Sequence, residues 1–326
     1  MTSALRLLLP LLLCSALGAG LAPSPAVAGD ISFGVIGHTQ GAAADAATLR
    51  TAIAESDADN LGFVVANGIK SAAESCGDDI YSERKILLDS AKNGLVVSLA
   101  ASDWAGCRNG AGKSVAPERL ARLRELFFGD DFSLGASRIP LIRQSASPKF
   151  RNYPENARWE LGDILFATIN LPADNNHYLS EAGRNSEFED RQVANRRWLQ
   201  RLFAHAAYKK LRGIVLFCDG NPLWPAVGAG RPRFDGYADM RQRLSTASRQ
   251  FAGRVLVVHG PLRPAATATP TQIVWRGNLG SLTLRPGWIK VTARDGDPAL
   301  FAVTGEFDAA PAAAVRSQRL GRLAAK

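Results

Sequence analysis

Polar side chains follow five apolar segments of this sequence, and they are the residues best suited to chemistry. These stretches are Gly37-His38-Thr39-Gln40, Asn67-Gly68-Ile69-Lys70, Ala101-Ser102-Asp103-Trp104, Asp219-Gly220-Asn221 and His259-Gly260-Pro261-Leu262-Arg263. In open α/β sheets, ligands bind beyond the carboxyl ends of the strands. If the apolar segments are parallel strands, these side chains should meet at one edge of a sheet.

The acidic and imidazole groups of this set are metal-ligand types. His38, Asp103, Asp219 and His259 could together hold one divalent transition metal, with His259 and Asp103 as the candidate catalytic residues. The alternative, which we favour, is that both histidines are loop residues with ordinary hydrogen-bond partners, because no fixed spacing links them. On that alternative no cofactor is expected.

The basic groups of the set could bind an anion. Lys70 and Arg263, with His38, would give a cationic pocket, and arginine grips phosphate or carboxylate through two parallel hydrogen bonds. The alternative is that Lys70 and Arg263 point into solvent, as most charged side chains do.

The elements that would position these residues alternate between strand and helix. Strands are predicted at 31–36, 61–66, 94–100, 158–160, 164–170, 213–217 and 254–259, and helices at 42–55, 82–90, 117–128, 188–208 and 237–251. This alternation indicates an α/β fold. Short segments at 271–275, 281–284, 288–293 and 300–303, separated by Gly and Pro, predict an antiparallel sheet edge.

The organisation of the chain is predicted to be simple. No Ser/Gly-rich or Pro-rich linker divides it, so we expect one domain over residues 29–308, followed by a basic, Ala-rich tail over 309–326.

Several further segments carry a family resemblance. They are Phe63-Val64-Val65-Ala66-Asn67-Gly68, Tyr153-Pro154-Glu155-Asn156 with Arg158-Trp159, Phe166-Ala167-Thr168-Ile169-Asn170-Leu171-Pro172, Asn175-Asn176, 255–260 and Asp297-Pro298-Ala299-Leu300-Phe301. Together with the five strand ends, they resemble the calcineurin-like metallophosphoesterases, and among these an exported bacterial branch. The resemblance implies a four-layer α/β/β/α sandwich of two mixed sheets, with two metal ions held by five successive loops.

The sequence departs from that family at nearly every metal ligand. His38 stands at the position of the first Asp, Gln40 at the following His, Ile69 at the bridging Asp, Ser102 at an Asn and Arg263 at the last His, and Asp219 is the nearest candidate on the fourth loop. Only His259 remains as a ligand of the family type. Because two dications need carboxylates to offset their repulsion, a two-metal site is not expected.

Other mechanisms have less support. The sequence has no Gly-x-Ser-x-Gly, His-Glu-x-x-His, P-loop or Cys-x-x-Cys motif. His177 lies in a predicted loop and is either a proton donor or a surface residue, and His205 is predicted to be a structural residue of its helix.

The N-terminus predicts export. Residues 1–28 combine Arg6, an apolar run at 7–13 and a small-residue cleavage site at Ala26-Val27-Ala28, the layout of a signal peptide. We therefore expect a periplasmic or secreted protein, with no membrane span after residue 28. In an oxidising compartment, Cys76 and Cys107, both in polar, Gly-rich sequence, should form a disulfide. Cys218 ends an apolar run and should be a buried free thiol.

The charge indicates the class of partner. A formal net charge of +9 favours an anionic small molecule or an acidic envelope polymer. Nucleic acid is not expected, because the basic residues lack interleaved aromatic side chains. The favoured hypothesis is a non-catalytic, phosphoesterase-like protein that binds an anionic ligand or partner in the former active-site cleft. The alternatives are a divergent hydrolase with a reduced metal site and an interaction module that uses its basic surface.

Overall fold

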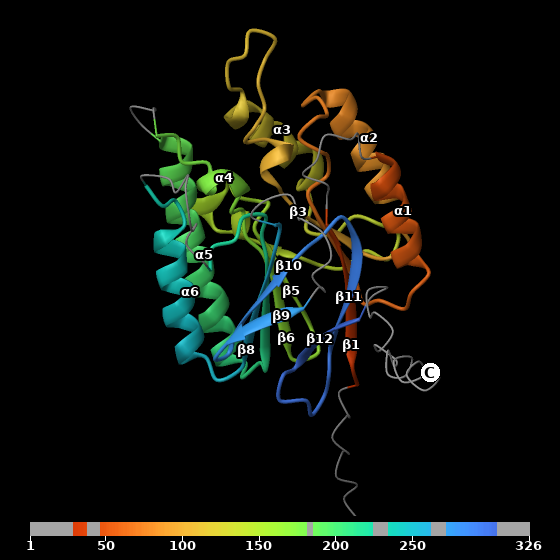
Figure 1. The fold of residues 1–326 in the computed structure, drawn as a ribbon, viewed down its shortest axis with the longest axis vertical. Coiled ribbons are helices and arrows are strands. Elements are labelled where there is room, and N and C mark those ends of the chain that lie inside the picture. The colour runs from red at the N-terminus through yellow and green to blue at the C-terminus, as the bar shows by residue number, and fades with distance from the viewer. Residues whose placement is uncertain (1–28, 38–45, 181–184, 224–233, 262–271, 305–326) are drawn as a thin grey trace, which may run out of the picture.

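The structure is a computed structural model that describes residues 29–37, 46–180, 185–223, 234–261 and 272–304. The predicted signal peptide at 1–28 and tail at 309–326 lie outside these ranges, as do His38, Gln40 and Arg263. The described residues form two mixed β-sheets with helices, the α/β class that the sequence predicts (Figure 1).

The first sheet has five strands in the order β12-β11-β1-β2-β3. They are β1 (Ile31–Gly37), β2 (Val64–Asn67), β3 (Leu95–Ser98), β11 (Gly287–Ala293) and β12 (Phe301–Thr304). β1, β2 and β3 run parallel to one another, whereas β11 and β12 are antiparallel additions beside β1. The carboxyl ends of the three parallel strands therefore meet at one edge of the sheet.

The second sheet has seven strands in the order β4-β5-β6-β7-β8-β10-β9. They are β4 (Ile142–Arg143), β5 (Ala157–Leu161), β6 (Ile164–Thr168), β7 (Gly213–Phe217), β8 (Arg254–His259), β9 (Ile273–Arg276) and β10 (Leu279–Thr283). β6, β7, β8 and β10 are parallel, and β4, β5 and β9 are antiparallel at the margins.

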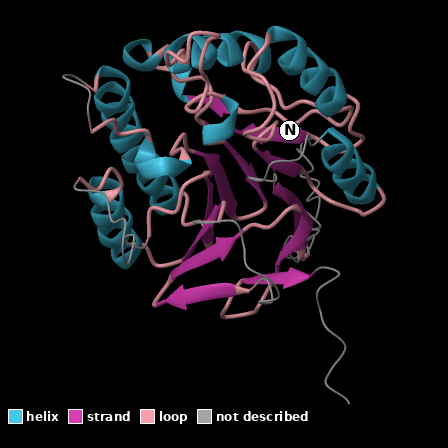
Figure 2. Ribbon diagram, turned by 45° about the horizontal axis from the view of Figure 1, so that its top comes forward, coloured by secondary structure: helices cyan, strands magenta, loops and turns pink. Residues whose placement is uncertain are grey.

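Three apolar cores define the layers (Figure 2). One core lies between the two sheets, and each of the other two lies between a sheet and its helices. On the first sheet lie α1 (Ala46–Asp57), α2 (Asp78–Asp89) and α3 (Ala116–Phe127), and on the second lie α5 (Ser186–Tyr208) and α6 (Ala238–Gln250). The short helix α4 (Ala173–Asn176) and the 3₁₀ turns Ala101–Asp103, Gln144–Ala146 and Pro148–Phe150 lie in connecting segments. The layers thus follow one another as helices, sheet, sheet, helices.

Burial on both faces explains why the central strands are continuously apolar. Along β8, Leu256 and Val258 face the core between the sheets, while Val255 and Val257 face α5 and α6. Side chains of a strand alternate between its faces, so a strand covered on both sides needs apolar residues throughout. For this reason the predicted strands at 213–217 and 254–259 match β7 and β8.

The C-terminal strands differ from the prediction of a single antiparallel edge. β11 and β12 do extend the five-stranded sheet in antiparallel fashion. β9 and β10, however, join the other sheet, where β10 pairs in parallel with β8. Short strands bounded by Gly and Pro do not reveal which sheet they will join, because the partner is set by packing far along the chain.

Candidate functional site

Asp103 holds the loop after β2 against the loop after β3. Its carboxylate is fully buried and accepts backbone N–H bonds from Ala100 at 2.8 Å, from Ile69 at 3.0 Å and from Lys70 at 3.3 Å. A carboxylate that accepts several backbone N–H groups satisfies buried donors that would otherwise cost free energy. The side chain therefore fixes the conformation of both loops.

Asp219 joins the edges of the two sheets in the same way. It follows β7, is 1% exposed, and its Oδ2 accepts the backbone N–H of Ala101 at 2.7 Å and of Ala173 at 2.8 Å. Ala101 follows β3 of the five-stranded sheet, whereas Ala173 follows β6 of the seven-stranded sheet. One carboxylate oxygen thus links three strand ends.

His259 is turned away from the space between the sheets. It is the last residue of β8 and shares a face with Val255 and Val257, which pack against α5 and α6. The ring is fully buried, and Nδ1 lies 2.6 Å from the carbonyl oxygen of Gly260, so Nδ1 donates. Nε2, 2.8 Å from the hydroxyl of Ser281, then accepts. Burial lowers the pKa of His259 to about 4, so the imidazole is neutral at pH 7.

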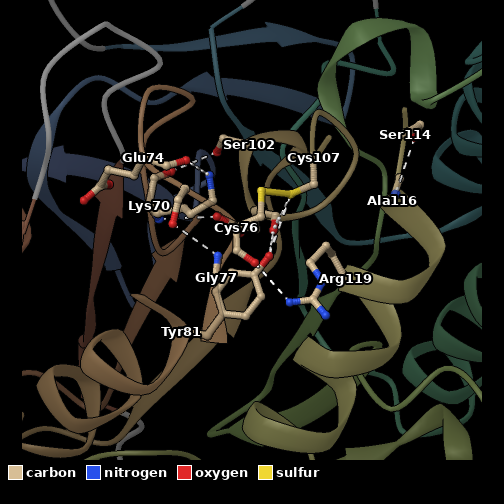
Figure 3. Close-up of a disulfide and its surroundings, with 12 residues drawn as sticks. Lys70, Glu74, Cys76, Gly77, Tyr81, Ser102, Cys107, Ser114, Ala116 and Arg119 are labelled. Carbon is tan, nitrogen blue, oxygen red and sulfur yellow. Dashed lines mark hydrogen bonds between the residues drawn. A yellow bond between two sulfur atoms is a disulfide. The ribbon is translucent and has the colours of Figure 1, made fainter. Parts of the chain in front are cut away.

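Lys70 is buried rather than solvent-exposed. Its ammonium donates to the carbonyl oxygens of Ser71 and Glu74, both at 3.0 Å, and its side chain curls back onto its own loop (Figure 3). Burial lowers its pKa from the ordinary value, while the nearby carboxylates of Asp103 and Glu74 act in the opposite direction. The Glu74 carboxylate also forms a buried ion pair with Arg84 of α2. Lys70 is thus part of the internal structure of this loop, in the conformation described.

The predicted disulfide is present beside Asp103. Cys76 and Cys107 are bonded with a Cα–Cα separation of 6.0 Å, and Cys218 is buried and free, as expected (Figure 3). The hydroxyl of Tyr81 donates to the carbonyl oxygen of Asp103 at 2.6 Å. The disulfide therefore joins the loop after β2 to the loop after β3, the same two segments that the Asp103 carboxylate connects.

A left-handed turn lies at the end of the seven-stranded sheet. The four residues from Asp174 to His177 all have positive φ, at 55°, 58°, 58° and 54°. Non-glycine residues rarely adopt this conformation in succession, because each costs roughly 1–2 kcal/mol. The buried Arg191 of α5 stabilises the turn by donating to the side-chain and backbone oxygens of Asn176, at 2.5 Å and 2.9 Å.

This turn places His177 against Trp104. The two ring centroids are 4.9 Å apart, and the Arg191 guanidinium carbon lies 5.6 Å from the Trp104 ring. His177 is partly exposed, and burial lowers its pKa from 6.5. From the sequence alone the role of His177 stayed open, and Arg191 was not recognised as a site residue. The Asp-Asn-Asn run was a signal for the turn, since Asp and Asn tolerate left-handed geometry.

Asn67 is a buried polar residue that lacks a hydrogen-bond partner in the part of the chain that the structure describes. It ends β2, between Gly37 of β1 and Ser98 of β3, and shares a strand face with Val65 in the core between the sheets. The side chain is 1% exposed, yet within the described residues neither its amide nitrogen nor its oxygen has a hydrogen-bond partner. Buried amides are nearly always paired, so this one is a candidate contact for a polar ligand.

The candidate metal ligands that the structure describes do not converge on one point. Among the residues that the structure describes, no three His, Cys, Asp or Glu side chains gather as a metal site would require. Asp103 and Asp219 bind neighbouring backbone N–H groups, those of Ala100 and Ala101 respectively. His259, however, lies on the face of its sheet that packs against the helices. The described donors do not fit a metal pair. His38, the fourth candidate, and Arg263, the second anion-binding candidate, are outside the described ranges.

His205 has the structural role expected of it. It lies on α5, and its Nε2 is 2.8 Å from the carboxylate of Glu160 on β5.

Comparison with known proteins leaves the family open. No family model matches the chain, and no curated protein matches it. The resemblance to metallophosphoesterases therefore rests on the quoted sequence segments alone.

Proposed function

We propose that this chain is an exported protein with a metallophosphoesterase-like fold that has lost the metal chemistry and binds an anionic ligand or partner at the strand-end edge. The observation that carries the proposal is the use of Asp103 and Asp219. Both carboxylates accept backbone N–H groups and connect loops, where a hydrolase would direct acids toward metal ions.

The orphaned amide of Asn67 supports a binding role at this edge. Among the described residues its nitrogen has no acceptor, and it lies at the ends of the parallel strands, where α/β proteins bind ligands. The net charge of +9 favours an anion over a cation.

The disulfide supports export. Disulfides persist in oxidising compartments and are rare in the cytosol. None of the helices that the structure describes has the length and apolar content to span a membrane.

Elemental analysis combined with an assay on bis(p-nitrophenyl) phosphate tests the loss of chemistry. We expect less than one tightly bound transition metal per chain and no hydrolysis. The alternative function, a hydrolase with one divalent transition metal on His38, Asp103, Asp219 and His259, makes the opposite prediction. Near-stoichiometric metal after dialysis, with turnover that a chelator and His259→Ala both abolish, would overturn the proposal.

Calorimetric titration with inorganic phosphate tests the binding role. We expect weak binding of phosphate, with an affinity that falls as the salt concentration rises. Asn67→Ala should lower this affinity further. Asn60→Ala, which removes an exposed amide, is the matched control. Equal effects of the two variants would argue against a ligand beside Asn67. Arg263→Ala should likewise weaken binding more than Arg322→Ala does, and equal losses would mean that only overall basicity matters.

A further inference from the structure

A ligand-sized groove lies between α5 and α6. These two helices are on the opposite flank of the molecule from α1 and α2 (Figure 1). Its volume is about 420 Å³, within the range typical of ligand sites. Leu199 and Ala247 contribute apolar lining, and most of the rest of the lining is polar: Arg196, Gln200, Asp239, Gln242, Arg243 and Gln250.

The charges in this groove do not balance. Arg196 and Arg243 both contact a single oxygen of Asp239, Oδ2, through their Nε atoms, at 2.8 Å and 3.0 Å. Two guanidinium groups therefore share one carboxylate, which leaves the groove with a net positive charge. The Arg243 side chain is 47% exposed, and within the described residues its contact with Asp239 is made through Nε. The outer nitrogens of Arg243 thus offer donors for an incoming anion.

The stretch of α5 beside the groove carries basic side chains and no acidic ones. From 191 to 210 the sequence contains no Asp or Glu. Arg197, Arg201 and Lys210 are exposed on or just after α5, whereas Lys209 pairs with the carboxylate of Glu160 on β5 at 2.9 Å. An anion approaching this flank meets no carboxylate on α5 along that stretch.

We propose that this groove binds a linear acidic polysaccharide. Guanidinium groups pair with the carboxylates of such a polymer through charge-assisted hydrogen bonds. The amides of Gln200, Gln242 and Gln250 both donate and accept, which suits the hydroxyl groups between the carboxylates.

Other occupants fit the groove less well. None of the described residues that line it is aromatic, so they do not provide the stacking that single-stranded nucleic acid requires. Its polar walls also lack the apolar anchors that dominate protein interfaces. The proposal is independent of the anion site beside Asn67, and shares with the proposed function only the export of the chain.

Titration of the purified protein with polygalacturonate oligomers tests this inference. We expect saturable binding that is absent with neutral dextran oligomers. Arg243→Gln should weaken it by about fivefold or more, because it removes the groove's surplus charge. Arg50→Gln, which removes an exposed arginine of α1 on the other flank, should change it less than about twofold.

A second variant separates shape from charge. Thr246→Trp fills the groove without altering any charge, and should also weaken binding while leaving phosphate binding unchanged. The inference is overturned if polygalacturonate does not bind, if Arg50→Gln matches Arg243→Gln, if Thr246→Trp has no effect in a folded protein, or if single-stranded DNA binds more tightly with the same dependence on these variants. Loss of phosphate binding alone would contradict the proposed function and leave this inference standing.

Discussion

Replacing Asp219 with Asn distinguishes a structural carboxylate from a metal ligand. The Asp219 Oδ2 accepts two buried backbone N–H groups, from Ala101 and Ala173. Leaving a buried donor unsatisfied costs about 1–3 kcal/mol, so removing both bonds should cost about 2–6 kcal/mol. Asn has the same shape and can place its one oxygen where Oδ2 lies, so both bonds remain but each loses the charge of the acceptor. We therefore expect Asp219→Asn to lower the free energy of unfolding by roughly 1–3 kcal/mol.

Urea denaturation, in buffer with and without a chelator, measures this change. Asp174→Asn is the matched control, because Asp174 is exposed and Asn also tolerates its positive φ. We expect the control to have little effect, and chelator to leave the wild-type midpoint unchanged. Carboxylates that serve a metal repel one another when the metal is removed, so neutralising one of them stabilises the apo protein. A more stable Asp219→Asn in chelator would therefore refute the structural role.

Three further perturbations test other features. Because burial lowers the pKa of His259 to about 4 from 6.5, the unfolded chain binds a proton that the folded one does not, so stability should fall by up to about 3 kcal/mol as the pH drops from 6.5 to 4. His259→Gln should flatten that part of a stability–pH curve; an unchanged slope would assign it to other groups. Lys210→Gly should raise the melting temperature and increase the free energy of unfolding by about 0.5–1 kcal/mol, because Lys210 follows α5 with a φ of 55°, which favours glycine. Lys209→Gly should lower the melting temperature, because Lys209 has an ordinary φ of −79°. Reduction of Cys76–Cys107, which closes a loop of 31 residues, should cost about 3–4 kcal/mol in denaturation experiments, and an unchanged midpoint would contradict the estimate.

The sequence contained much of the fold because its signals are local. The apolar runs of β7 and β8 and the Pro-led start of α3 can each be recognised without knowledge of their partners. The pairing of Cys76 with Cys107 could be predicted for a similar reason, since Cys14 lies in the predicted signal peptide and Cys218 follows a buried strand.

The details of the site depend on partners far along the chain, and these the sequence could not supply. Nothing local indicates that Asp219 accepts the N–H of Ala101, or that the buried Arg191 holds a left-handed turn. Lys70 is a second example. Lysine is usually exposed, and the carbonyl oxygens of the loop around Lys70 offset the free-energy cost of burying its ammonium.

The position of β1 within its sheet has a consequence for how the chain acquires its structure. β1 lies between β2 and β11, and its register with β11 runs from Ile31 opposite Ala293 to Gly37 opposite Gly287. During synthesis, one edge of β1 therefore has no native partner until nearly the whole chain has been made. Pairings this distant in sequence slow folding, and an open strand edge favours association with other chains. We expect a chain shortened before residue 287 to aggregate rather than to fold into a smaller domain, and a chaperone that covers exposed strand edges to matter most in that interval.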